Sequence, residues 1–107
     1  MDNLQVLAVP RVAAINDAFR ESGFGVTLTC GVQSVKDLTG LLRTVRLYNG
    51  FNEDNDPYGE HDFGRINWKG DSVFWKIDYY NQALDEWEDP LSPTCKRVIT
   101  VMLAGEY

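Results

Sequence analysis

The sequence predicts an α+β domain in which an antiparallel sheet of about four strands carries two helices packed on one face. Two segments repeat apolar residues at helical intervals, and four are rich in β-branched residues or alternate apolar with polar side chains. The helical segments are residues 10–22 and 34–48, and the strand segments are residues 26–32, 63–68, 72–80 and 95–103. The predicted order is therefore α-β-α-β-β-β.

The chain has 107 residues, a length that suits one domain, and we expect residues 1–107 to fold as a single unit. A hydrophobic fraction of 44% with 12% aromatic residues favours a folded globule. No apolar run approaches the roughly 20 residues that span a bilayer, and the first residues lack the basic and apolar regions of a secretory signal. These features predict a cytoplasmic protein without membrane contact.

The chain is acidic, with 16 acidic and 10 basic residues and a formal charge of −6. A negative balance repels nucleic acid, so we do not expect direct binding of DNA or RNA. It suits a protein partner with a basic surface.

The first helix is predicted to begin at Pro10, since proline is favoured at the first helical position, and to end at Gly23. Residues 1–8 show no clear period. The expected apolar face consists of Val12, Ile15 and Phe19. The side chains expected in water are Arg11, Asp17 and Arg20.

The segment 26–32 has a period of two, typical of a strand. The face expected to be buried consists of Val26, Leu28, Cys30 and Val32. Cys30 and Cys95 are far apart in the chain, and we predict two buried free thiols. The second helix is predicted to start from Ser34 as N-cap and to end at Asn49-Gly50. Its apolar face consists of Leu38, Leu41, Leu42, Val45 and Tyr48.

Two alternating segments around Lys69-Gly70-Asp71 predict a β-hairpin. The core face of its second strand is expected to consist of Val73, Trp75, Ile77 and Tyr79, which leaves Phe74, Lys76, Asp78 and Tyr80 on the opposite face. Residues 81–94 are acidic and contain two prolines, so they predict a connecting loop with at most one helical turn. Residues 95–103 close the predicted sheet.

The most unusual segment is residues 51–62, which we call the acidic loop. Its carboxylates are Glu53, Asp54, Asp56, Glu60 and Asp62, and it holds the only histidine of the chain, His61. Asn, Asp, Pro and Gly at this density predict an ordered, turn-rich loop. Loops held between regular elements are frequent sites of function.

The chain resembles a family of short, uncharacterised proteobacterial proteins that is known only as a domain of unknown function. The resemblance rests on the run Asn55-Asp56-Pro57-Tyr58-Gly59-Glu60-His61-Asp62-Phe63-Gly64, on residues 74–80 and on residues 97–107. It extends to residues 15–20 and 29–32. The family implies a small intracellular bacterial protein, sometimes associated with mobile elements, and implies no activity for particular residues.

Several chemical roles of the acidic loop remain open. A histidine flanked by carboxylates can act as a general base, and carboxylate-rich loops hold hard cations. Counted from Asp54, however, a calcium loop fails at Tyr58 and Arg65, and no Cys or His pair has zinc spacing. We therefore predict no metal and no cofactor. The favoured interpretation is a turn in which Asp56 and Asp62 cap backbone groups and His61 is a polar bridge.

The leading hypothesis is a non-enzymatic, acidic protein-interaction module. The predicted partner-binding residues are Glu53, Asp54, Asp56, Tyr58, Glu60, His61, Asp62, Asp78 and Tyr80. Its most specific form is an inhibitor from a phage or mobile element that occupies the nucleic-acid groove of a host defence complex, such as an anti-CRISPR protein. The alternative is a small hydrolase or metal-dependent enzyme using Glu60, His61 and Asp62. A homodimer through an exposed sheet face or edge is compatible with both.

Overall fold

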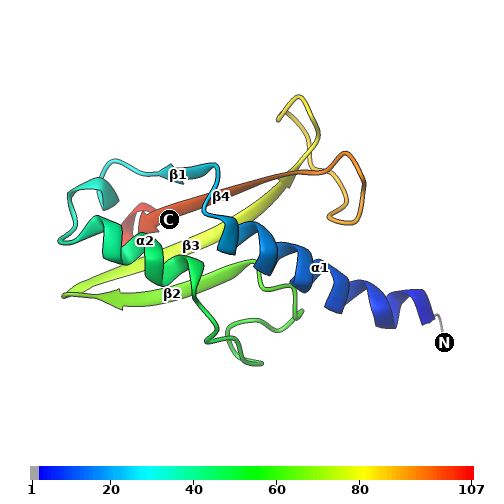
Figure 1. Ribbon diagram of the computed structural model, residues 1–107, viewed down its shortest axis with the longest axis horizontal. Helices are drawn as coiled ribbons and strands as arrows, with labels where there is room; N and C mark the ends of the chain where they lie inside the picture. The colour runs from blue at the N-terminus through cyan, green and yellow to red at the C-terminus, as the bar shows by residue number, and fades with distance from the viewer. Residues whose placement is uncertain (1–2) are drawn as a thin grey trace.

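The computed structural model describes residues 3–107 and shows two helices on one face of a four-stranded sheet (Figure 1). The elements in chain order are α1 (Asn3–Ser22), β1 (Val26–Leu28), the 3₁₀ turn η1 (Val32–Ser34), α2 (Leu38–Arg46), β2 (Phe63–Trp68), β3 (Asp71–Tyr80), β4 (Lys96–Leu103) and the 3₁₀ turn η2 (Ala104–Glu106). The predicted α+β class and element order are confirmed. Among the described residues, no helix is long and apolar enough to cross a membrane.

The strand order in the sheet is β1-β4-β3-β2. The pairs β2–β3 and β3–β4 are antiparallel, but β1 runs parallel to β4, with Val26 opposite Ile99. The prediction of a wholly antiparallel sheet is therefore wrong at this edge. A parallel pair needs a long crossover connection, and here α2, the acidic loop and the β2–β3 hairpin together supply it.

The β2–β3 hairpin is confirmed, and its two turn residues explain the tight connection. Lys69 and Gly70 both have positive φ, 48° and 95°, as a type I′ turn requires. Further along β2, a Cβ atom at Gly64 would overlap the indole of Trp75, so the ring packs directly against the β2 backbone. Only glycine allows this approach.

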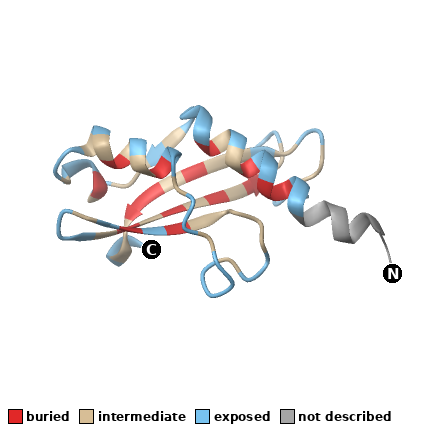
Figure 2. Ribbon diagram, turned by 60° about the horizontal axis from the view of Figure 1, so that its bottom comes forward, coloured by how far each residue is buried: buried red, intermediate tan, exposed pale blue. Residues whose placement is uncertain are grey.

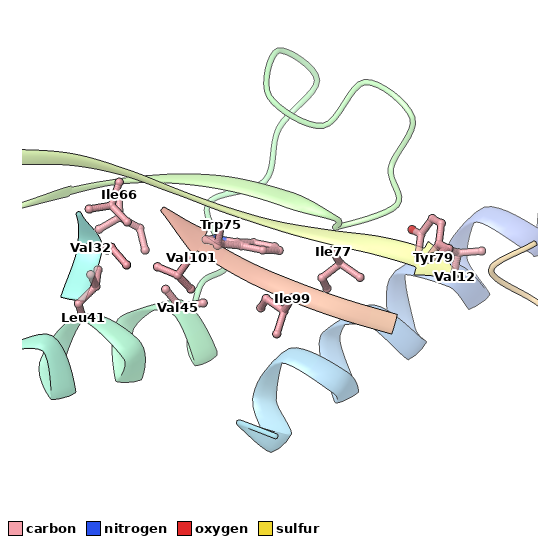
Figure 3. Packing of buried hydrophobic residues seen from close by; sticks show 11 residues of the cluster. Val12, Val32, Leu41, Val45, Ile66, Trp75, Ile77, Tyr79, Ile99 and Val101 are labelled. Atoms are coloured by element: carbon pink, nitrogen blue, oxygen red, sulfur yellow. The ribbon is translucent and has the colours of Figure 1, made fainter. Parts of the chain in front are cut away.

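The core lies between the sheet and the two helices (Figure 2). The predicted inner face of β3 is confirmed, because Val73 and Trp75 are fully buried and Ile77 and Tyr79 are 3% and 8% exposed. Side chains from β4, α2 and α1 surround this row in Figure 3, and they include Ile99, Val101, Leu41, Val45 and Val12.

Helix α1 differs from the prediction in its start and in its buried face. It begins at Asn3 and runs through Pro10, so the predicted start at Pro10 is wrong. The buried face contains Val12, Ala13, Asn16 and Arg20, whereas Ile15 is 39% exposed. Arg20, expected in water, is only 3% exposed. The face is rotated because Asn16 and Arg20 have polar partners on other elements, and these are described below.

The segment after α1 is less regular than predicted. Strand β1 ends at Leu28, and Val32 lies in η1, so Cys30 is exposed and the prediction that it is buried is wrong. Cys95 is half-buried. Helix α2 is capped by the Asp37 carboxylate, which accepts a hydrogen bond from Gly40 N at 3.1 Å, and Ser34 belongs to η1. The helix therefore starts later than predicted.

Residues that follow β4 are hydrogen-bonded to the segment after β1, at one edge of the sheet. The Glu106 carboxylate accepts hydrogen bonds from the Thr29 hydroxyl at 2.6 Å, from Leu103 N at 2.9 Å and from Gly31 N at 2.8 Å. These bonds lower the pKa of Glu106, the Thr29 bond contributing most. The connecting loop 81–94 contains neither helix nor strand, as predicted, apart from a single bridge between Tyr80 and Trp87.

Candidate functional site

The acidic loop folds on itself through successive turns. The Asn52 side chain accepts hydrogen bonds from Asp54 N and Asn55 N at 2.9 and 3.0 Å, and Asn55 Oδ1 accepts from Asn52 N at 2.9 Å. Asp56 N donates to Asn52 O at 2.8 Å. Asn and Asp side chains that bond nearby backbone are the usual means of ordering such turns.

The second half of the acidic loop closes on Asp56. His61 N donates to the two Asp56 carboxylate oxygens at 3.3 and 3.4 Å, so Asp56 caps a backbone group as the sequence predicts. Its side chain is 6% exposed. His61 has φ of 56°, a left-handed conformation that is uncommon for a residue with a Cβ atom. The adjacent Asp62 comes directly before β2, and its carbonyl, rather than the predicted capping carboxylate, is the group that bonds β3, since it accepts from Ile77 N at 2.8 Å.

The His61 ring joins the acidic loop to α1. Nδ1 lies 3.0 and 3.1 Å from the Asp17 carboxylate oxygens, and the ring stacks on Phe51 with centroids 3.9 Å apart. Because a carboxylate only accepts, Nδ1 carries the proton of this bond. On the other side, Nε2 is 3.7 Å from Asp56 Oδ2. His61 is therefore a polar bridge, and it contacts Asp17 and Asp56, not Glu60 or Asp62.

Asn16 is the fully buried centre of a second connection. Its amide donates to Glu60 O at 2.9 Å and to the Tyr79 hydroxyl at 2.8 Å, and its Oδ1 accepts from Arg97 Nε at 2.6 Å. Arg97 also donates to Pro90 O at 2.8 Å. One side chain on α1 thus ties the acidic loop to β3, to β4 and, through Arg97, to the connecting loop.

Arg20 supports the start of the acidic loop from inside the core. Its guanidinium donates to Asp17 at 3.1 Å and to Tyr48 O at 2.9 Å, and its central carbon lies 5.0 Å from the Trp75 ring centroid. A buried charge is costly unless it is paired and hydrogen-bonded, and a cation over an aromatic face gains further attraction. The buried Arg20 side chain therefore depends on these tertiary partners.

The predicted site residues fall into three groups. Glu53, Asp54 and Tyr58 are exposed at the tip of the acidic loop, Tyr58 by 80%. Asp62, Asp78 and Tyr80 line one hollow of about 400 Å³ together with Trp87. Asp56 and His61 are anchors with their side chains turned toward the protein, and Glu60 is half-buried with its carbonyl bound to Asn16.

Carboxylates are crowded at the base of the acidic loop. Burial raises the pKa of Glu60, and the negative charges of Asp62 and Asp56 raise it further. Burial also raises the pKa of Asp62, with further contributions from Asp56 and Asp78. Lys76 lies 3.0 Å from Asp78 and balances that carboxylate, and the hydrogen bond raises the pKa of Lys76. A cationic group placed beside Glu60 and Asp62 would relieve this repulsion.

The chemistry of this arrangement is limited by how His61 is used. Its Nδ1 is bonded to Asp17, while Nε2 lies 3.7 Å from the Asp56 carboxylate, which has no proton for a histidine base to remove. Within the part of the chain that the structure describes, no group of three or more His, Cys, Asp or Glu side chains is placed to hold a metal ion.

The residues that hold the acidic loop are not among those predicted from the sequence. Asn16, Asp17 and Arg20 were assigned to the surface or not considered, and Arg97 was treated only as part of a strand. A signal was present, because Val12, Asn16 and Arg20 follow one another at intervals of four and so share one helix face. Polar residues that continue an apolar stripe indicate buried polar partners.

Comparisons with known proteins identify a family and no activity. No curated protein and no solved structure matches the chain. A family model described as "Protein of unknown function (DUF3768)" matches residues 27–106, which include the acidic loop, α2 and all of β2, β3 and β4. The match does not extend to α1, although the resemblance noted in the sequence included residues 15–20. Since the match covers most of the chain, the protein belongs to the DUF3768 family of unknown function.

Proposed function

We propose that the protein is an acidic protein-interaction module whose partner carries a basic surface, and that the acidic loop is the main contact. The observation that carries this proposal is that some side chains of the acidic loop anchor it and others remain exposed. His61 bonds the loop to Asp17 of α1 and Asp56 caps His61 N, while Glu53, Asp54 and Tyr58 remain exposed. A surface that is already ordered loses little conformational entropy when a partner binds.

The exposed residues suit such a contact chemically. Tyrosine provides a large, rigid contact area, and carboxylates around it steer a basic partner and speed its association. Crowded carboxylates at Glu60 and Asp62 also favour a partner that brings a lysine or arginine close to them. The proposed order of importance is therefore Tyr58 for affinity and the surrounding carboxylates for rate.

A narrower form of the proposal is inhibition of a nucleic-acid-binding host complex, such as a CRISPR effector. An acidic surface presents the charge that such a groove is built to bind. The net charge of −6 and the small size of the chain support this form. It predicts that the partner, once purified, releases a labelled oligonucleotide when the module is added, and an unchanged oligonucleotide affinity would contradict it.

The test is affinity capture with two matched triple variants. The tip variant is Glu53→Ala, Asp54→Ala and Tyr58→Ala, which leaves the anchors Asp56 and His61 intact. The control variant is Glu21→Ala, Asp71→Ala and Phe24→Ala, which removes two carboxylates and one exposed aromatic ring elsewhere. Each protein is immobilised and the bound proteins from a bacterial lysate are quantified by mass spectrometry.

We expect a basic protein that is retained by the wild type and the control variant and lost from the tip variant. With the purified partner, the association rate should fall as the salt concentration rises, because exposed charges are screened within a Debye length of about 8 Å at physiological ionic strength. Equal retention by the tip variant, or a salt-independent rate, would contradict the proposal.

The enzyme hypothesis based on Glu60, His61 and Asp62 stays a prediction and has its own test. Wild type and Glu60→Gln would be assayed against chromogenic ester and phosphodiester substrates with and without divalent cations. Turnover that is lost in Glu60→Gln would favour an enzyme. Activity equal in both proteins would show that these residues are not catalytic.

A further inference from the structure

A groove beside α2 has the opposite charge from most of the molecule. It lies between the C-terminal end of α1, α2 and the edge of the sheet, with a volume of about 450 Å³. Its floor is apolar, and Arg43 and Arg46 of α2 lie at its rim. The apolar floor residues are Val26, Leu42, Val45 and Ile99. We call this the arginine groove.

No carboxylate lines the arginine groove, although acidic residues outnumber basic ones in the chain. On the other side of α2, a second hollow of about 460 Å³ is lined by Arg43 and Arg65, also without a carboxylate. Arginine at a rim with an apolar floor fits a ligand that carries acidic groups around a large apolar side chain. A nucleic-acid backbone would use the arginines but would leave the apolar floor uncovered.

The connecting loop of the same protein has that chemistry. Leu84 and Trp87 are 46% and 69% exposed. Four carboxylates surround them, those of Asp85, Glu86, Glu88 and Asp89. Exposed tryptophan is the side chain most often found as an energetic anchor in protein interfaces.

The connecting loop is ordered by its own hydrogen bonds. Asn81 N donates to Glu86 O at 2.9 Å, and Asn81 Oδ1 accepts from Asp85 N at 3.1 Å. Thr94 Oγ1 donates to Glu88 at 2.8 Å. Trp87 is therefore held outward on a defined backbone, which lowers the entropic cost of docking it.

We propose that the connecting loop of one copy docks in the arginine groove of a second copy. Trp87 and Leu84 would cover the apolar floor, and Glu86 with its acidic neighbours would meet Arg43 and Arg46. In Figure 1 the loop lies beyond one end of the sheet and α2 covers the other end, and Figure 2 agrees, so one chain does not fill its own groove. The contact joins two different surfaces, so it gives a two-fold dimer where the exchange is reciprocal, and rings or open chains where it is not.

This association is independent of the proposed function. The tip residues Glu53, Asp54 and Tyr58 take no part in it, so they remain free to bind the basic partner of the proposed function. Copies with a net negative charge repel one another at long range, but at physiological ionic strength distant charges are screened and the contact pairs are not. The association should therefore be weakest at very low salt and strongest at intermediate salt.

The test is sedimentation velocity over a range of concentrations up to about 1 mM, where even a weak specific contact is populated. The groove variant is Arg43→Glu with Arg46→Glu, and the loop variant is Leu84→Ala with Trp87→Ala. We expect concentration-dependent oligomers for the wild type, with the dissociation constant raised at least about tenfold in each variant. Controls are Arg11→Glu, which makes half of the groove variant's charge change at an exposed site on α1, and Tyr58→Ala; both should associate as the wild type does.

Mixing the two variants gives the sharpest result. Each has one intact surface, since the groove variant keeps its loop and the loop variant keeps its groove. An equimolar mixture should form a one-to-one dimer and nothing larger, because the remaining loop and groove no longer match. Far-UV circular dichroism of each variant checks that the fold is retained, and a variant that has lost it is replaced by Arg43→Glu alone or Trp87→Ala alone.

Three outcomes would overturn the proposal. The wild type remains monomeric at every concentration and salt tested, or it associates equally well in both variants. Alternatively, a fluorescein-labelled single-stranded oligonucleotide binds the monomeric wild type and loses binding in Arg43→Glu, which would assign the groove to phosphate groups.

Discussion

The acidic loop and the connecting loop of this protein are both rich in carboxylates, but they are held in different ways. The acidic loop, residues 51–62, is anchored to the core by His61 on Asp17 and by Glu60 on the buried amide of Asn16. The connecting loop, residues 81–94, is ordered mainly by exposed bonds within itself, and it meets the core through the Leu91 side chain and through Pro90 O, which accepts from Arg97. Two loops of similar composition therefore differ in how extensively they are hydrogen-bonded to the rest of the protein, and the acidic loop is the more extensively bonded.

This difference predicts which substitutions change the stability of the whole protein and which change only one loop. Buried polar groups cost free energy when a partner is removed, whereas exposed bonds exchange readily for water. Changes in the anchors of the acidic loop should therefore affect the whole protein, and changes within the connecting loop should affect that loop alone. Four measurements test this contrast.

The largest effect is expected for Asn16→Leu. The substitution keeps the approximate volume but removes the two donors to Glu60 O and Tyr79 and the acceptor for Arg97. We expect a loss of about 3 kcal/mol in the free energy of unfolding, measured by urea denaturation. The matched change in the connecting loop is Gln82→Leu, which removes one exposed bond to Thr94 O and should cost less than about 1 kcal/mol. Equal costs would abolish the contrast.

Arg20→Met should have the next largest effect. Methionine fills the aliphatic space but leaves Tyr48 O without the Arg20 donor, leaves Asp17 with His61 alone, and removes the cation above Trp75. The expected loss is about 2 kcal/mol, with a lower melting temperature in calorimetry. Arg46→Met, on the exposed side of α2, is the control and should change the melting temperature little. A cost for Arg20→Met no larger than that control would show that the buried charge is not stabilising.

His61→Asn tests the anchor of the acidic loop itself. Asparagine tolerates the positive φ of this residue but cannot stack on Phe51 as the imidazole does. We expect a loss of about 1 kcal/mol and faster amide hydrogen exchange in residues 52–62, with residues 81–94 unchanged. Tyr58→Ala, at the exposed tip, should leave the exchange of both loops as in the wild type. Faster exchange in both loops would mean that the two are not independent.

The smallest effect concerns pH. Burial raises the pKa of Asp62 in the folded protein above its ordinary value, so the folded state binds more protons than the unfolded state between the two values. Its contribution to stability is therefore lost as the pH rises through this window. Asp62→Asn should equal the wild type at pH about 3 and exceed it by less than about 1 kcal/mol at pH 7, since the group is partly solvated. Urea denaturation across this range measures it, and a variant less stable at pH 7 would reverse the sign.

Local patterns predicted the fold well where the structure depends on neighbours in sequence. The hairpin turn at Lys69-Gly70 and the buried face around Trp75 follow from short-range chemistry and alternation. The parallel pairing of β1 with β4 did not, because Val26 and Ile99 are distant in sequence and nothing near either of them specifies the other. The start of α1 does not follow from local pattern either, because proline favours the first helical position, whereas this helix begins at Asn3 and continues through Pro10.

The candidate site was predicted in part for the same reason. Composition identified the acidic loop, and its turn chemistry follows from Asn52 and Asp56. Which side of the loop faces outward depends on its contacts with Asp17 and Asn16. These residues are distant from the loop in sequence and meet it only in the folded protein. Arginine is seldom buried, so Arg20 was placed in water; the carbonyl of Tyr48 and the ring of Trp75 make the exception.

The parallel β1–β4 pair also governs when the protein can fold during its synthesis. As the chain leaves the ribosome, Val26 to Leu28 emerge before α2, β2 and β3, whereas the strand β4 that pairs with them and the Glu106 carboxylate that bonds Thr29 and Gly31 emerge after these elements. The N-terminal part of the chain, including β1, is therefore synthesised before the strand with which it pairs. Nascent chains stalled before β4 should remain sensitive to protease along β1 and η1, and the hydrogen bonds from Thr29 and Gly31 to Glu106 should form only once residues 96–106 have left the ribosome.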